Sequence, residues 1–429
     1  MKTLKLTKKY EKYPEYKDSG IEWTQKVPES WDVTYLRAIA KENELKNTGG
    51  LNQNLLSLSY GKIITKDING LGGLLPESFG TYQVVQKGDI VMRLTDLQND
   101  NKSLRVGFVE EKNGIITSAY LVLVFSGLLV VKRFAYYLLH SYDLQKVYYG
   151  MGGGVRQTLD FFDFKYLPVL MPDTKVQEEI VSFLDEKTTL IDSVIEKKQK
   201  QIEFLKEKRS ALINHAVTKG LDPKAKFVDS DIEWIGKIPV GWSVEKLKFV
   251  APQRNAESGF IQDEKYVGLE NVESNTGRFI DAEEKVEPES LVNFFRKGDV
   301  LFGKLRPYLA KVFLPDFDGV STGEFLDLVP DTKKACSGYL FYKLISKDFI
   351  TLVNNSTYGT RMPRANWSFI GNQVIVYPLV NEQKQIVAYL DKKTRLIDES
   401  VTKVERAIEL LQEFKSSLIS HAVTGKIRI

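Results

Sequence analysis

Basic and aromatic residues gather around several predicted loops of this 429-residue chain. Arginine can form paired hydrogen bonds with guanine, asparagine and glutamine can do so with adenine, and lysine neutralises phosphates. These residue types therefore suit a DNA-binding surface. The candidates in the first half are Arg93, Arg105, Tyr148, Tyr149, Arg156 and Gln157. The candidates in the second half are Lys304, Arg306, Tyr308, Tyr358, Arg361, Arg364 and Asn366.

The placement of these groups is the argument for DNA contact. Taken singly, such a residue is more often a solvated surface residue. In each half, however, one group lies near a predicted strand end, where Arg93 and Arg105 bracket the polar loop 95–103 in the first half. Another group lies in a late loop, glycine-rich over 149–157 and polar over 354–366. The glycine run 151–154 lacks the strand-loop-helix setting of a dinucleotide-binding fingerprint. A flexible DNA-contacting loop fits better there, although an ordinary surface loop explains any single residue equally well.

Residues for catalysis or metal binding form no recognisable constellation in the sequence. There are three histidines and one cysteine, Cys336, which excludes a disulfide framework and a cysteine-based metal site and fits a reducing, cytoplasmic setting. A Walker A loop and an Asn-Pro-Pro-Tyr methyltransferase motif are absent. The Pro-Asp-Thr-Lys segments at 172–175 and 330–333 are too tight to place a nuclease-type metal site, so we interpret them as turns.

Composition permits a nucleic-acid partner without requiring one. The net charge is +4, and the apolar content of 43% and charged content of 27% are ordinary for a soluble protein. The longest apolar run, 119–131, is too short to span a bilayer and is interpreted as a buried strand followed by a turn.

An internal repeat organises the chain. Asp-Ser-Gly-Ile-Glu-Trp ending at Trp23 returns as Asp-Ser-Asp-Ile-Glu-Trp ending at Trp234, and each is followed eight residues later by Trp31 or Trp242. Lys-Gly-Asp recurs at 87 and 297, and His-Ala-Val-Thr at 215 and 421. The chain is therefore one globular part and one long helix, repeated; we interpret the paired tryptophans as core anchors.

The long helices are predicted over about 176–217 and 383–423. Apolar residues recur at alternating steps of four and three in both, the pattern of a coiled-coil seam. Such a helix spans roughly 60 Å, more than the roughly 34 Å of one turn of B-DNA. The globular parts are predicted as mixed α and β, with helices near 36–45, 130–147 and 339–352 and the remaining periodic runs as strands.

This doubled layout resembles the specificity subunit of type I restriction-modification systems, the HsdS family. The segments that carry the resemblance are 16–23 with 27–31, 232–242, Lys-Gly-Asp at 87–89 and 297–299, 301–307, and the helix openings at 177–181 and 381–387. One departure is that the Glu-Gln pair of the helix opening is kept only at 382–383, because Val176 precedes Gln177.

The resemblance implies a fold of the α+β class. It implies two mixed α/β target recognition domains, each followed by a long helix, with the two helices pairing as an antiparallel coiled coil. The expected domains are a first target recognition domain over 1–174, a central helix over 175–220, a second target recognition domain over 221–380 and a C-terminal helix over 381–429.

The implied function is non-catalytic recognition of a bipartite, interrupted target in double-stranded DNA. The expected partners are methyltransferase subunits, two of them, and restriction/translocase subunits, with no membrane association. S-adenosylmethionine, ATP and Mg would belong to those partners and no cofactor to this chain. A single-chain methyltransferase and a structural coiled-coil scaffold are the alternatives, which S-adenosylmethionine binding and failure to retard any DNA duplex would respectively favour.

Overall fold

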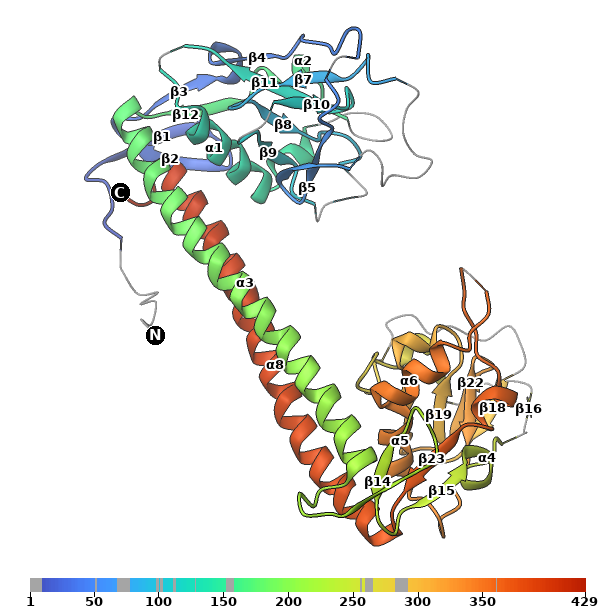
Figure 1. Ribbon diagram of the computed structural model, residues 1–429. Coiled ribbons are helices and arrows are strands. Elements are labelled where there is room, and N and C mark those ends of the chain that lie inside the picture. Colours follow the sequence, from blue (N-terminus) through green and yellow to red (C-terminus); the bar gives the residue numbers. More distant parts are fainter. Residues whose placement is uncertain are drawn as a thin grey trace. The chain divides into compact units, whose positions relative to one another are not determined.

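The computed structural model describes residues 10–50, 52–67, 78–97, 100, 103–110, 113–127, 129–151, 158–254, 257–258, 265–281, 292–359 and 361–429. The chain divides into two compact units. Unit 1 contains residues 1–197 and 406–429, and unit 2 contains residues 198–405. Each unit therefore combines one globular part with a segment from each of two long helices (Figure 1).

The two long helices are α3 (Thr174–Lys219) and α8 (Val380–Val423), as the heptad pattern predicted. Each helix starts shortly after a proline, which cannot continue a preceding helical hydrogen-bond ladder. Gln177 and Gln383 occupy the same place in the first turns and make the same contacts. Their side chains accept hydrogen bonds from the backbone N–H groups of Val131 and Cys336, both at 2.9 Å. Each also donates to the carbonyl of the nearby proline, at 2.8 and 2.9 Å.

The globular part of unit 1 is built from short antiparallel sheets. Strands β4, β11, β8 and β9 form a four-stranded sheet in that order, and the other strands form the pairs β1–β2, β3–β12, β5–β6 and β7–β10. The strands are β1 (Tyr16–Ile21), β2 (Thr24–Pro28), β3 (Asp32–Tyr35), β4 (Ala40–Glu42), β5 (Leu56–Ser59), β6 (Lys62–Thr65), β7 (Gln83–Val85), β8 (Ile90–Met92), β9 (Val106–Phe108), β10 (Gly114–Ile116), β11 (Leu121–Phe125) and β12 (Pro168–Met171). Helical segments are η1 (Leu36–Ala38), α1 (Lys132–Leu144), η2 (Val147–Gly150) and α2 (Phe161–Phe164).

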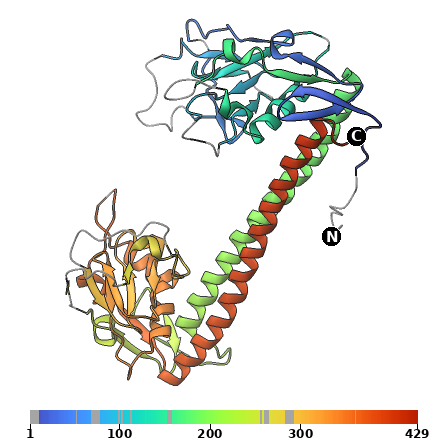
Figure 2. The ribbon, with the colours of Figure 1, turned by 180° about the vertical axis from the view of Figure 1, so that it is seen from behind.

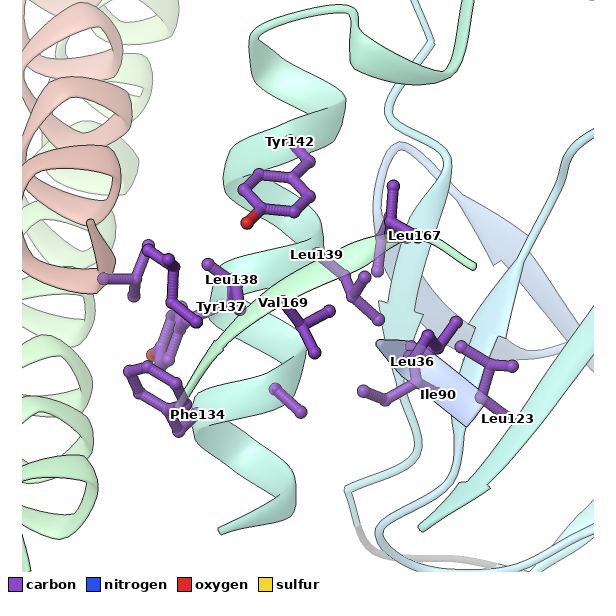
Figure 3. Packing of buried hydrophobic residues seen from close by; sticks show 14 of the residues in the cluster. Leu36, Ile90, Leu123, Phe134, Tyr137, Leu138, Leu139, Tyr142, Leu167 and Val169 are labelled. Atoms are coloured by element: carbon purple, nitrogen blue, oxygen red, sulfur yellow. The ribbon is translucent and has the colours of Figure 1, made fainter. Parts of the chain in front are cut away.

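Helix α1 joins the sheets of unit 1 to the long helices. Leu139 of α1 points toward Leu36, Ile90 and Leu123 of the sheet side, while Tyr137 lies on the side of the long helices (Figure 3). The Tyr137 hydroxyl donates to Asp185 of α3 at 2.5 Å. In unit 2 the Tyr342 hydroxyl donates to Asp391 of α8 at 2.7 Å, so the docking of a globular part onto the start of its following helix is repeated.

The globular part of unit 2 follows the same plan. Its sheets are β20–β19–β22, β16–β18–β21–β17, β13–β14 and β15–β23, antiparallel except for the β17–β21 pair. The strands are β13 (Phe227–Asp229), β14 (Lys237–Pro239), β15 (Ser243–Lys246), β16 (Glu257–Ser258), β17 (Tyr266–Val267), β18 (Val292–Phe295), β19 (Val300–Gly303), β20 (Val312–Phe313), β21 (Gly319–Thr322), β22 (Phe325–Leu328) and β23 (Val374–Tyr377). Helical segments are α4 (Leu247–Val250), η3 (Leu269–Asn271), η4 (Pro307–Leu309), α5 (Ser337–Ile345), α6 (Lys347–Asn354) and α7 (Trp367–Ile370).

The repeated Lys-Gly-Asp segments form the same turn in both units. Gly88 (φ +94°) and Gly298 (φ +91°) adopt the left-handed conformation that favours glycine. The carboxylate of Asp89 accepts a backbone hydrogen bond from Gln86 at 2.7 Å, and that of Asp299 accepts one from Arg296 at 2.8 Å. The motif is therefore a structural turn before a core strand. Trp31 and Trp242 are buried, as expected for core anchors.

Within each unit, segments of α3 and α8 lie side by side, as both views show (Figures 1 and 2). In unit 1, Lys415 pairs with Asp192 at 2.7 Å, and in unit 2, Arg209 pairs with Asp398 at 2.9 Å. The ends of the predicted seam also pack into the globular cores, with Ile180 and Leu418 in the core of unit 1. The seam is thus covered by globular residues as well as by a helix.

Three predicted elements were wrong in detail. Residues 36–45 form η1 and strand β4 instead of a helix, because β4 pairs with β11 in the sheet. Residues 57–64, one of the periodic runs predicted to be a single strand, form a hairpin whose turn holds Tyr60 (φ +46°) and Gly61 (φ +76°), the conformation that a two-residue turn requires. The predicted helix 339–352 is split into α5 and α6 at Ser346, which has an extended backbone.

Candidate nucleic-acid interface

In unit 1, Arg105 is buried and organises the loop that follows β8. Its guanidinium makes five hydrogen bonds within the chain. The acceptors are the carbonyls of Arg93 (3.1 Å), Thr95 (2.8 Å), Asp96 (3.2 Å) and Asp100, and the hydroxyl of Tyr149 (2.8 Å). Since the side chain is 0% exposed, our prediction that Arg105 contacts DNA directly was wrong. It shapes the loop instead.

Asp143 and the ring of Tyr149 add further contacts to Arg105. Asp143 of α1 accepts the backbone N–H of Arg105 at 2.6 Å, and burial raises the pKa of the Asp143 carboxyl to about 6. The Tyr149 ring lies 5.1 Å from the Arg105 guanidinium, a cation–π distance. This network fixes the loop after β8 against η2.

The remaining candidates of unit 1 have different environments. Tyr148 is fully buried and donates to the Leu139 carbonyl at 2.6 Å, so its predicted DNA contact was also wrong. Arg93 is about one-third exposed, in a long ion pair with Asp100 at 3.6 Å. Tyr149 is half-buried. Arg156 and Gln157 lie outside the described residues.

In unit 2, the segment after β19 and the late loop are brought together. Arg306 donates its backbone N–H to Pro363 at 2.7 Å, and Ala365 donates to Lys304 at 3.0 Å. Arg364 forms bridges with both Leu305 and Tyr358. The two predicted groups of unit 2 therefore form one surface.

Several side chains on this surface are free to meet a ligand. Tyr308 is 51% exposed and Tyr358 58% exposed, and Arg361 and Asn366 are also exposed. Arg306 has a left-handed backbone (φ +49°), which non-glycine residues rarely adopt. Backbone strain of this kind concentrates at functional sites. Within the described part of the chain, the buried Arg306 Nε has no hydrogen-bond partner.

Lys304 and Arg364 are tied more closely to the protein. Lys304 is half-buried, and its backbone N–H donates to the Glu324 carbonyl at 2.9 Å. Arg364 makes a two-pronged ion pair with the Glu324 carboxylate, at 2.8 Å for the shortest contact. These hydrogen bonds to Glu324 raise the pKa of Arg364. Sequence reasoning missed Glu324 and Asp143, because an isolated acidic residue gives no signal of its partner.

The loop arrangement is repeated between the units. In unit 1, Leu159 after the late loop donates its backbone N–H to Leu94 after β8, at 3.0 Å. In unit 2, Ala365 and Lys304 make the corresponding contact. Each unit thus joins a strand-end segment to a late loop, and each does so with different side chains.

Among the described residues, His, Cys, Asp and Glu side chains form no group of three or more that could hold a metal ion. In that part of the chain, every helix is too short or too polar to cross a membrane.

Comparisons with known proteins agree over nearly the whole chain. A sequence profile described as the type I restriction modification DNA specificity domain matches residues 239–410. The chain is 24% identical to the type I restriction enzyme MjaVIII specificity subunit of Methanocaldococcus jannaschii, covering 94% of each protein. It is 19% identical to the EcoDI specificity subunit of Escherichia coli, covering 89% of this chain and 90% of that protein.

The fold is shared with a solved structure. A chain from a type I R-M system, studied for complex assembly and conformational transition, matches with a TM-score of 0.65 and 16% identity, covering 94% of this chain and 99% of that chain. The profile covers the second half, and the internal repeat relates that half to the first. Over nearly its whole length, the chain is therefore similar to the DNA specificity subunits of type I restriction-modification systems.

Proposed function

We propose that this chain is the subunit of a type I restriction-modification complex that selects the DNA sequence. Each unit reads one half of a bipartite, interrupted target in double-stranded DNA. The observation that carries this proposal is the repeated joining of a strand-end segment to a late loop, with exposed basic and aromatic side chains in unit 2 and a partly exposed arginine in unit 1. Because the loop sequences differ, the two half-sites differ.

The proposed contacts divide by chemistry. Arg306, Arg361 and Asn366 in unit 2, with Arg156 and Gln157 in unit 1, carry groups that match guanine or adenine edges. Arg93 and Lys304 suit phosphates, which position the protein without reading the sequence. The tyrosines Tyr149, Tyr308 and Tyr358 complete the surface with apolar and hydrogen-bonding contacts.

The two long helices pair as an antiparallel coiled coil that sets the spacer between the half-sites. The two ion pairs between the helices support this geometry. Asp192 and Asp398 are 206 residues apart, as are Arg209 and Lys415, and each basic residue pairs with the acidic residue of the other repeat. This reciprocal pattern is what a two-fold interface produces.

The outer faces of the helices dock two methyltransferase subunits. Large apolar side chains are exposed there in repeat-related pairs: Leu190 (41%) with Leu396 (46%), and Phe204 (64%) with Leu410 (49%). Exposed apolar groups of this size mark protein-binding surfaces when they are arranged in order. Two equivalent surfaces fit two copies of one partner.

Catalysis belongs to the partners. The methyltransferase subunits supply S-adenosylmethionine and the methyl transfer, and the restriction/translocase subunits supply ATP- and Mg-dependent cleavage. The specificity subunit itself holds no cofactor, acts in the cytoplasm and contributes recognition and assembly.

Methylome sequencing of cells that carry this chain with its methyltransferase tests the proposal. We expect one methylated motif with two unlike half-sites separated by unspecified bases. A continuous motif, or methylation that is independent of this chain, would contradict the proposal. Binding of S-adenosylmethionine by the isolated chain would favour a single-chain methyltransferase instead.

A further inference from the structure

One acidic residue of unit 2 joins the two segments that carry the candidate DNA contacts. Glu324 lies between β21 and β22. Its carboxylate accepts hydrogen bonds from Arg364 Nε at 3.1 and 3.2 Å and from Arg364 Nη2 at 2.8 Å. Its backbone carbonyl accepts the Lys304 N–H at 2.9 Å. Glu324 therefore touches both the segment after β19 and the late loop.

Arg364 transmits this contact to the exposed side chains. Its backbone exchanges two hydrogen bonds with Tyr358, at 3.1 and 3.2 Å, and it lies opposite Leu305 in a second bridge. The neighbouring Pro363 accepts the backbone N–H of Arg306 at 2.7 Å. Movement of Arg364 would therefore displace both Tyr358 and Arg306.

The electrostatics agree with a supporting role for this pair. A free carboxylate beside DNA would repel phosphates, but the Arg364 guanidinium neutralises Glu324 in a two-pronged geometry that fixes orientation as well as charge. The side chains of Arg364 and Glu324 are only 39% and 26% exposed. Arg364 is thus committed to the protein, while Arg361, Tyr308 and Tyr358 remain open.

We propose that Glu324 is the positioning residue of the DNA-reading surface of unit 2. Its carboxylate holds Arg364, and through Arg364 the late loop, in the arrangement that presents Arg306, Tyr358 and Arg361 to the second half-site. This inference rests on the proposed DNA recognition and assigns Arg364 to loop support instead of direct base contact. The loop of unit 1 is supported differently. The segment between β10 and β11, residues 117–120, contains no acidic residue, and the buried Arg105 supports the loop instead.

The experiment measures binding of the full chain, with its methyltransferase, to duplexes in which either half-site is intact or scrambled. Glu324→Ala should weaken binding to the intact target about tenfold, and Glu324→Gln about threefold because the amide keeps one acceptor. Discrimination at the first half-site should not change. The exchanged pair Glu324→Arg with Arg364→Glu should restore affinity to within about threefold of wild type.

The controls separate positioning from direct contact. Glu245 of the same unit is 29% exposed and pairs with Lys334 at 2.8 Å, so Glu245→Ala is a matched control that should bind DNA like wild type. If circular dichroism shows that Glu324→Ala does not fold, the DNA-binding measurements on Glu324→Gln and on the exchanged pair test the proposal instead.

Two results would overturn the positioning role. One is wild-type affinity in Glu324→Ala. The other is an altered base preference at one position that the exchanged pair does not restore, because cytosine can donate directly to a glutamate. Failure of the proposed function is distinguishable, because the wild-type complex itself would then not prefer the intact target.

Discussion

The loop of unit 1 should depend on the buried guanidinium of Arg105, and Arg105→Met tests this. Methionine has similar length and fills the space, but it cannot make the five guanidinium hydrogen bonds. Four backbone carbonyls would lose this donor. Losing hydrogen bonds from a charged group and leaving buried acceptors without a partner costs about 3–5 kcal/mol. We therefore expect unit 1 to be destabilised by about that amount.

The assay is urea unfolding of the full chain, combined with hydrogen exchange at the backbone amides of residues 93 and 105. Arg105→Met should lower the free energy of unfolding of unit 1 and speed exchange at both amides. Arg93→Met is the matched control: its side chain is about one-third exposed in a 3.6 Å ion pair, so the change should be below about 1 kcal/mol. If Arg105→Met were as stable as Arg93→Met, the assignment of Arg105 as the loop support would be refuted.

Three other predictions follow from burial, charge and exposure. Asp398→Asn should lower the free energy of unfolding of unit 2 by about 2 kcal/mol, because its partner Arg209 is only 10% exposed. Asp192→Asn, in the more exposed pair with Lys415, should cost less than about 1 kcal/mol. Urea unfolding measures both changes. Burial and Lys415 lower the pKa of His140 to about 4, so the unfolded chain binds more protons between pH 6.5 and 4. Stability should fall as the pH is lowered through that window, and His140→Leu should lessen the fall in urea titrations at several pH values; an unchanged slope would contradict the assignment. Phe204→Asp should weaken methyltransferase binding at least about tenfold, measured by calorimetry. Because Phe204 is 64% exposed, the free energy of unfolding should change by less than about 0.5 kcal/mol. Unaltered binding would show that Phe204 is not part of the docking surface.

The repeat made the main architecture predictable from the sequence. Heptad spacing identified both long helices to within three residues at each end. The recurring glutamines and Lys-Gly-Asp turns proved to be equivalent structural parts, because they make the same hydrogen bonds in both units, and Trp31 and Trp242 are both buried.

Short elements were less predictable, because tertiary contacts override local preference. Residues 36–45 are rich in helix-forming types, yet the backbone of 40–42 completes a sheet beside β11. The break at Ser346 between α5 and α6 has no strong sequence signal such as proline or glycine.

The candidate site shows the same limit. The sequence pattern around an arginine near a loop is the same whether the side chain is exposed, as in Arg361, or buried, as in Arg105. Burial depends on distant partners, here Asp143 and Tyr149, which pattern alone does not connect. The two groups of unit 2, which were predicted separately, lie together in the structure.

The most direct test of the central claim removes one heptad from each long helix at repeat-related positions, 195–201 and 401–407, and then sequences the methylome. Seven residues at 1.5 Å each shorten the helix pair by roughly 10 Å, or about three base pairs at 3.4 Å per base pair. If two units read two half-sites across a helical spacer, both half-sites should persist and the unspecified spacer should become shorter. An unchanged spacer, or altered half-site sequences, would contradict the account.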